Sequence, residues 1–215
     1  MGLLPKALEG LEVTGTLATL LGRAGTPAQI PEPRLARFMF ADVRLGWLWL
    51  LIRVYVGWQW LSAAIEKLQG PGWIGTGAGS ALRGFVDGSI RGSVGAHAAV
   101  QGWYAGPLRD LVLPHTAVWS YAVTFGELAV GLALILGLFT GIAAFSGAFM
   151  NMNYMMAGTV SINPILLFLE LFLILAWQVA GYLGLDFFAL PWLGTPWNRG
   201  PLSTPALPRV SPLPD

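Results

Sequence analysis

Two carboxyl groups and three asparagine amides interrupt a stretch of sequence that is otherwise almost wholly apolar. Between residues 119 and 184 lie Glu127, Asn151, Asn153, Asn163 and Glu170, of which Asn153 is expected to point away and Asn163 to cap a helix. A carboxylate at the depth of a bilayer is costly unless it is paired, hydrated or protonated. Carboxyl groups in such a place can take up and release protons, and an amide can orient a polar ligand. The sequence therefore predicts a buried polar site, which either binds a ligand or joins helices.

These polar groups are expected to lie at similar depth. Counting along each apolar segment at about 1.5 Å per residue places Gln59, Glu127, Asn151 and Glu170 in the middle to outer half of a membrane. Asn151 shares a helix face with small residues that allow close helix approach. We therefore expect its side chain to face the interior of a helix bundle.

Quinone chemistry suits such a set of groups. Reducing a quinone requires an apolar slot for the ring and tail, with donors or acids beside the two carbonyl oxygens. We expect Glu127 and Glu170 to be the catalytic, proton-transferring groups. The expected cofactor-binding residues are Arg53, Gln59, Trp60, Asn151 and Tyr154.

A structural alternative uses the same residues. Arg53 would pair with Glu127, and the asparagines would bond to neighbouring backbones as a polar core without chemistry. Lys67, at the end of an apolar segment, is expected to extend towards the lipid headgroups. The residues alone leave the choice between a ligand site and a polar core open.

The composition excludes several classes of protein. Of the 215 residues, 55% are hydrophobic and only 11% are charged, whereas a soluble domain carries roughly a quarter charged residues. The net charge of +1 argues against a nucleic-acid partner. The chain has no cysteine, which excludes iron–sulfur clusters and cysteine-based zinc sites. Both histidines fall in a loop, so we expect no haem and no metal site.

Four apolar segments can each span a membrane. Each is about 20 residues long, enough for a hydrocarbon core of about 30 Å. Together they predict an all-α integral membrane protein, a four-transmembrane-helix bundle. The predicted spans are residues 45–68, 116–138, 140–160 and 164–184.

The remaining sequence divides into three polar segments. Residues 1–44 form an N-terminal cytoplasmic or interfacial segment before the membrane domain at 45–190. A long Gly-rich loop, 69–115, connects the first two spans, and residues 191–215 form a Pro-rich C-terminal tail. Lys and Arg are concentrated before the first span, which places both termini in the cytoplasm and the long loop at the outer face.

Several stretches resemble the DoxX/DoxD family of small bacterial membrane proteins. They are RVYVGWQWL with the following Glu66-Lys67, FGELAVGLALILG, AFMNMNYMMAGTVSINP and AGYLGLD. The resemblance implies a four-helix bundle in the bacterial cytoplasmic (inner) membrane. For the DoxD branch it implies the membrane subunit of a thiosulfate:quinone oxidoreductase with a DoxA-like protein partner. One departure is Phe187 after Asp186, where the family often has Arg.

Three functions are consistent with these features. The first is a subunit that binds quinone within the bundle and passes electrons from an outer-face partner, with membrane lipid around it. The second is a non-catalytic structural or assembly subunit of a larger bacterial respiratory or photosynthetic membrane complex, which the N-terminal segment and Pro-rich tail favour. A small-solute transporter has less support, because the sequence shows no pair of broken helices.

Overall fold

The computed structural model describes residues 32–195. The Pro-rich tail beyond residue 195 and most of the N-terminal segment lie outside the described residues. The chain divides into two units, Met1–Ala36 and Arg37–Asp215, and the arrangement below is that of the second. Its regular structure, in the described part, is helical. α2 (Arg34–Ala41) and the short turn η1 (Val43–Leu45) precede the longest helix.

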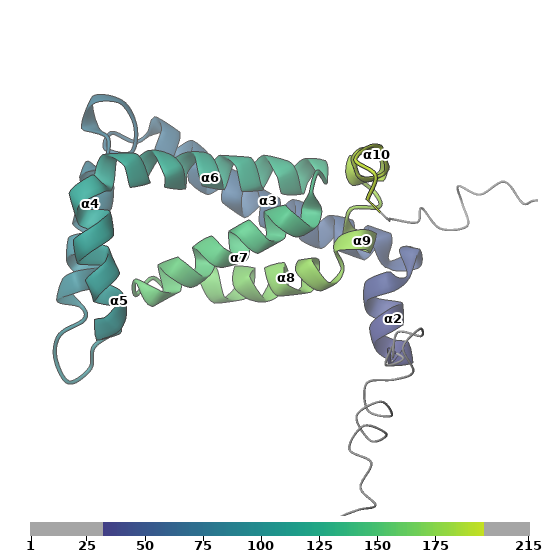
Figure 1. The fold of residues 1–215 in the computed structure, drawn as a ribbon, viewed down its shortest axis with the longest axis horizontal. Coiled ribbons are helices and arrows are strands. Elements are labelled where there is room, and N and C mark those ends of the chain that lie inside the picture. The colour runs from purple at the N-terminus through teal and green to yellow at the C-terminus, as the bar shows by residue number, and fades with distance from the viewer. Residues whose placement is uncertain (1–31, 196–215) are drawn as a thin grey trace, which may run out of the picture. The chain divides into compact units, whose positions relative to one another are not determined.

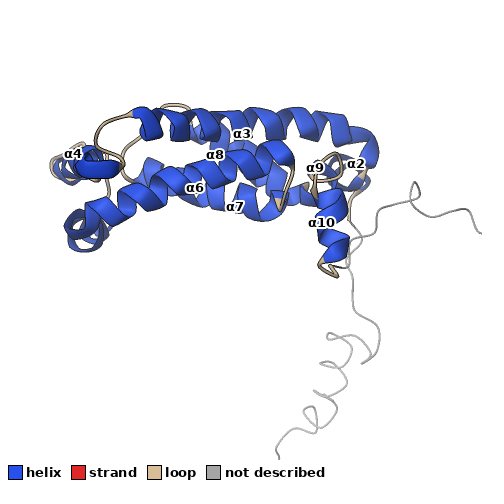
Figure 2. Cartoon of the chain, turned by 90° about the horizontal axis from the view of Figure 1, so that it is seen from above, coloured by secondary structure: helices blue, strands red, loops and turns tan. Residues whose placement is uncertain are grey.

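A helix overlaps each of the four segments predicted to span: α3 (Gly46–Gln69), α6 (Thr116–Leu136), α7 (Thr140–Met156) and α8 (Asn163–Leu175). These helices run alongside one another (Figures 1 and 2). α3 packs most extensively against α6, and α7 against α8. Two described stretches, Val43–Gln69 and Gly102–Leu136, have the length and mean hydropathy to cross a membrane, and α8 is a shorter apolar helix.

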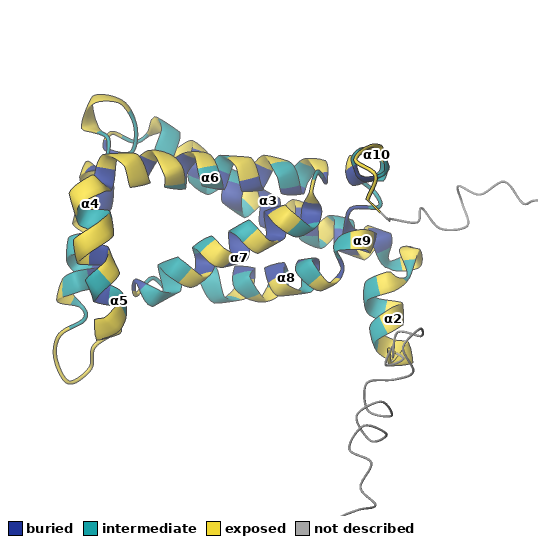
Figure 3. Cartoon of the chain, viewed as in Figure 1, coloured by how far each residue is buried: buried dark blue, intermediate teal, exposed yellow. Residues whose placement is uncertain are grey.

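The distribution of side chains is that of a protein surrounded by lipid. Large apolar side chains are exposed on the outward faces of the helices, among them Trp47, Phe145 and Phe168. Buried residues occur at helical intervals along each of the four helices (Figure 3). Several of the buried residues are polar, including Glu127 and Glu170. Exposed apolar faces around an interior that also contains buried polar groups suit hydrocarbon rather than water.

The loop predicted at 69–115 is folded into a helical cap. α4 (Ser80–Arg91) lies across one end of the four helices, here named the α4 end (Figure 1). The cap is bonded to α6, where the Ser120 hydroxyl donates to the Trp73 carbonyl, and to the end of α7, where Ser89 Oγ donates to Ala157 O at 2.8 Å. η2 (Gly75–Gly77), α5 (Gly102–Pro107), η3 (Leu108–Val112) and η4 (Leu113–His115) complete the cap.

The fourth predicted span, 164–184, ends earlier than expected. α8 stops at Leu175, because the backbone leaves the helical region at Ala176, and α9 (Trp177–Ala180) and α10 (Asp186–Trp192) follow. This break turns the chain back at the end of the bundle opposite α4, here named the α10 end. Asp186 N there donates to Gly137 O at 2.7 Å.

Two glycines bring α3 and α6 into backbone contact. A Cβ at Gly131 would lie 2.6 Å from Leu61 N, and one at Gly57 would lie 3.0 Å from Gly131 O.

We expect Gly131→Ala to lower the free energy of unfolding by about 1–3 kcal/mol, because the helices must separate. Steric-trapping unfolding in bicelles measures this. Gly126→Ala is the control, since a Cβ there meets only Met150 Sδ, at 3.4 Å; equal losses in both variants would contradict the prediction.

Candidate functional site

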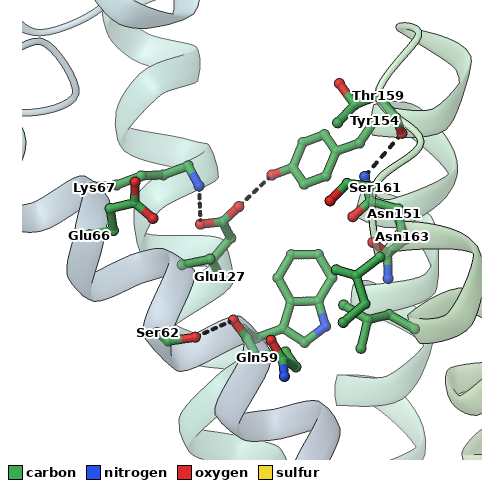
Figure 4. Close-up of a pocket in the computed structure, with 14 residues that line it drawn as sticks. Gln59, Ser62, Glu66, Lys67, Glu127, Asn151, Tyr154, Thr159, Ser161 and Asn163 are labelled. Atoms are coloured by element: carbon green, nitrogen blue, oxygen red, sulfur yellow. Dashed lines mark hydrogen bonds and ion pairs between the residues drawn. The ribbon is translucent and has the colours of Figure 1, made fainter.

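A polar cavity of about 510 Å³ lies among α3, α6, α7 and the turn that connects α7 to α8 (Figure 4). The helices contribute carboxyl, ammonium, amide and aromatic side chains, and the turn contributes hydroxyl groups. The lining residues are Gln59, Trp60, Ser62, Ala63, Glu66, Lys67, Glu127, Asn151, Tyr154, Thr159, Ser161, Ile162, Asn163 and Leu166.

Glu127 joins three helices at one side of the cavity. Its carboxylate Oε2 lies 2.8 Å from Lys67 Nζ of α3, and its Oε1 accepts a 2.8 Å hydrogen bond from the Tyr154 hydroxyl of α7. Glu127 is 1% exposed, and the Lys67 side chain is 18% exposed. The ammonium also lies 4.9 Å from the centroid of the Trp73 ring in the cap. The expectation that Lys67 extends to the headgroups is therefore wrong: its charge is held inward by a buried carboxylate.

Glu170 joins three helices at the other side. Its Oε1 accepts a 2.6 Å hydrogen bond from Trp60 Nε1 of α3, and its Oε2 accepts a 2.7 Å bond from Asn151 Nδ2 of α7. Because both carboxylate oxygens are acceptors here, the Asn151 amide must present its NH₂ group to Glu170. Asn151 Oδ1 is then left buried without a hydrogen-bond partner. The site thus holds an unused acceptor beside the cavity.

Gly147 makes the Glu170 arrangement possible. A Cβ at this position would lie 2.5 Å from Glu170 Oε1 and 3.0 Å from Trp60 Nε1. Any larger residue would displace the carboxylate from its indole donor. A small residue on the Asn151 face of α7 therefore serves a polar contact as well as close helix packing.

The structure brings together most of the residues singled out from the sequence. Gln59, Trp60, Glu127, Asn151 and Tyr154 line the cavity. Glu170 lies behind its wall, bonded to two of the lining side chains.

Arg53 does not belong to this group. It lies fourteen residues before Lys67 in α3, about 21 Å along the helix axis. Its guanidinium is 1% exposed, and its Nη2 donates to Leu183 O at 3.0 Å at the α10 end. The alternative pairing of Arg53 with Glu127 is also wrong, because Lys67 occupies that position.

The site includes two features that the sequence did not predict there: Lys67 and the turn that contributes hydroxyl groups. The sequence contained one usable signal, the adjacent Glu66-Lys67 at the end of the first span. The turn residues Thr159 and Ser161 gave no signal, because their approach to the cavity depends on how α7 and α8 pack.

Comparison with known proteins agrees with this architecture. The family model DoxX matches residues 48–160, more than half of the chain. The match includes the cavity residues from Gln59 to Thr159 and ends before Glu170. A search of the curated proteins and of the solved structures finds no match. The chain belongs to the DoxX family of membrane proteins.

Proposed function

We propose that the polar cavity binds the ring of a membrane quinone and delivers protons to it, within a DoxD-like membrane subunit. The observation that carries the proposal is a pair of buried carboxyl groups at one cavity, with Glu127 on its lining and Glu170 behind its wall, bonded to two of the lining side chains. Buried ionisable groups in a membrane protein mark ligand sites and proton paths more often than lipid contacts.

The cavity fits a quinone ring in size and in the groups around it. Its volume of about 510 Å³ lies within the usual range of small-molecule pockets. The Trp60 and Tyr154 rings, with centroids 6.2 Å apart, supply flat apolar walls. The Lys67 ammonium has further protons to donate to a carbonyl oxygen, and the Tyr154 hydroxyl oxygen, whose proton goes to Glu127, can accept from a hydroxyl of the reduced ring.

The residues around the cavity can move protons. A bound quinone takes up two electrons and two protons, one proton at each oxygen. The Glu127 carboxylate lies between the Lys67 ammonium and the Tyr154 hydroxyl and can exchange protons with both. Glu66, exposed at the rim, offers a route for protons from water. Glu170 positions Trp60 and Asn151 rather than touching the ring itself.

The charges at the cavity support the oxidation of the electron donor at another protein. Glu66 and Glu127 line the cavity with one cation, Lys67, and Glu170 lies behind its wall. A dianion such as thiosulfate would be repelled by this balance. In this proposal a DoxA-like partner at the outer face oxidises the donor and passes electrons to the quinone.

The proposal includes a placement in the membrane. α3, α6, α7 and α8 cross the cytoplasmic membrane of a bacterium, with both termini in the cytoplasm and the α4 end at the outer face. The Lys and Arg residues before α3 support this orientation. The cavity then lies in the outer half of the bilayer, within reach of a partner on that side.

A second candidate function rests on the same hydrogen bonds. Glu127 ties α3, α6 and α7 together, and Glu170 ties α3, α7 and α8. Such bonds alone can specify a bundle that serves as an assembly subunit of a larger membrane complex. The two functions differ in whether the isolated protein binds a quinone.

Quinone binding to the purified full chain in lipid nanodiscs separates the two functions. We expect Glu127→Gln and Glu170→Gln each to weaken binding of decylbenzoquinone about tenfold or more, because the first changes a charged group on the cavity lining and the second weakens the bonds that hold two lining side chains. Isothermal titration, corrected with empty nanodiscs, gives the affinities. Asp110→Asn is the control, since this exposed carboxylate lies outside the cavity. Unchanged affinity in both glutamine variants would show that the site is elsewhere, and no binding by the wild type would favour the assembly role.

A further inference from the structure

A second, apolar groove of about 250 Å³ lies beside the polar cavity. It runs between the helical cap and the ends of α6 and α7. Leu82 and Val86 of α4, Val112 of η3 and Val123 of α6 form its walls. Its polar groups are few, and Tyr104 and Asn153 at its edge are bonded to each other at 2.9 Å. A hydrocarbon chain can therefore occupy the groove without removing water from an unpaired polar group.

The Tyr154 side chain is shared by the groove and the cavity. Its hydroxyl donates to Glu127 on the cavity side. The rest of the groove beside it is apolar, with Met150 and Ala157 as neighbours on α7. A molecule with a polar ring at Tyr154 and an apolar chain attached to that ring would occupy both spaces at once.

The groove is bordered by exposed apolar side chains. Two apolar side chains on its lining, Leu111 and Phe149, are 55% and 60% exposed. Exposed apolar side chains in a membrane protein face the hydrocarbon. A chain dissolved in the bilayer can thus reach the groove from the side.

We propose that this groove binds the isoprenoid tail of the quinone whose ring occupies the polar cavity, with Tyr154 at the junction. The inference rests on the proposed quinone function and adds a tail site to it. Continuity with the cavity through one shared side chain favours the tail of the same ligand over an independent lipid chain. The ring is then held by polar contacts and the tail by apolar burial, and affinity depends on tail length.

The test compares two probes on the full chain in nanodiscs. One is 2,3-dimethoxy-5-methylbenzoquinone, which has no tail, and the other is the same ring with a ten-carbon alkyl chain. Val112→Phe and Val123→Phe fill the groove from opposite walls. We expect each variant to weaken the tailed probe at least tenfold and to leave the tailless probe within twofold of the wild type.

A matched variant and a folding control accompany the test. Val118→Phe makes the same change on α6 at a side chain that is 69% exposed and outside the groove, and it should alter neither affinity. Thermal unfolding identifies any variant that fails to fold. Because the two groove variants lie in different elements, η3 and α6, one of them can still test the groove if the other fails to fold.

The outcomes are distinguishable. An unchanged affinity for the tailed probe in both groove variants would overturn the tail site, and this is the result expected if an unrelated lipid chain occupies the groove. An equal loss of affinity for both probes would also overturn it. If the wild type binds neither probe, the proposed quinone function fails and the tail site fails with it. If the tailless probe binds and the groove variants have no selective effect, only the tail site fails.

Discussion

Replacing Lys67 with methionine is expected to lower the free energy of unfolding by about 3–5 kcal/mol, because the Glu127 carboxylate is then buried without its cation. Lys67 Nζ lies 2.8 Å from Glu127 Oε2, and the carboxylate is 1% exposed. Removing one member of a buried pair costs far more than removing both. The double variant Lys67→Met/Glu127→Gln should therefore recover most of the lost stability. Its glutamine still offers an acceptor to the Tyr154 hydroxyl.

The double variant also separates stability from binding. If the pair belongs to a quinone site, restored stability will accompany an affinity that stays at least tenfold below the wild type. Arg83→Met is the control, because it removes an exposed cation of the cap whose Nη2 makes only a long, 3.4 Å hydrogen bond, to Leu113 O. Steric-trapping unfolding and quinone titration give the two quantities. A double variant as unstable as Lys67→Met alone would contradict the ion-pair interpretation.

The helical architecture could be predicted from the sequence because it depends on local composition. Four long apolar segments must satisfy their backbone groups internally, which in lipid requires helices. The structure has a helix at each of the four, and the family match supports a membrane protein. The break at Ala176 could not be predicted, because no proline or charge marks it in the sequence.

The residues of the cavity could be predicted only in part. Depth was sufficient to group Gln59, Glu127 and Asn151, since it follows from counting along each helix. Which cation meets which carboxylate depends instead on the lateral order and tilt of the helices. That order places Lys67 against Glu127 and leaves Arg53 at the α10 end. Sequence spacing contains no direct information on such contacts.

The α10 end contains a second buried polar arrangement, centred on Asp186. Its carboxylate accepts hydrogen bonds from Phe139 N at 2.5 Å and Thr140 N at 2.9 Å, at the start of α7. Phe139 is held at a φ of 49°, a conformation uncommon for a residue with a side chain. The buried Arg53 guanidinium interacts electrostatically with this carboxylate. A Cβ at Gly137 or Gly184 would overlap that guanidinium, so both glycines are needed to admit it.

We expect Asp186→Ala to lower the free energy of unfolding by about 3–5 kcal/mol, because it removes the cap of α7 and leaves Arg53 without a nearby negative charge. Asp186→Asn should cost less, since its amide oxygen can still accept from one of the two backbone N–H groups, although the other N–H loses its acceptor and the charge is lost. The double variant Arg53→Leu/Asp186→Asn should be close to the wild type if the charge interaction dominates. Steric-trapping unfolding of the three variants in bicelles measures these differences.

The comparison among the variants distinguishes the cap from the charge. Two results together would contradict the prediction. One is an Asp186→Asn variant as unstable as Asp186→Ala, which would mean that asparagine does not replace the cap. The other is an absence of rescue by Arg53→Leu, which would mean that the carboxylate does not act as a partner of Arg53. Asp110→Ala, at an exposed carboxylate of the cap, is the control and should change stability by less than about 0.5 kcal/mol. Because Asp186 lies at the opposite end of the bundle from the polar cavity, Asp186→Asn should leave the affinity for decylbenzoquinone unchanged in protein that remains folded. A selective loss of quinone affinity in that variant would instead place the quinone ring at the α10 end.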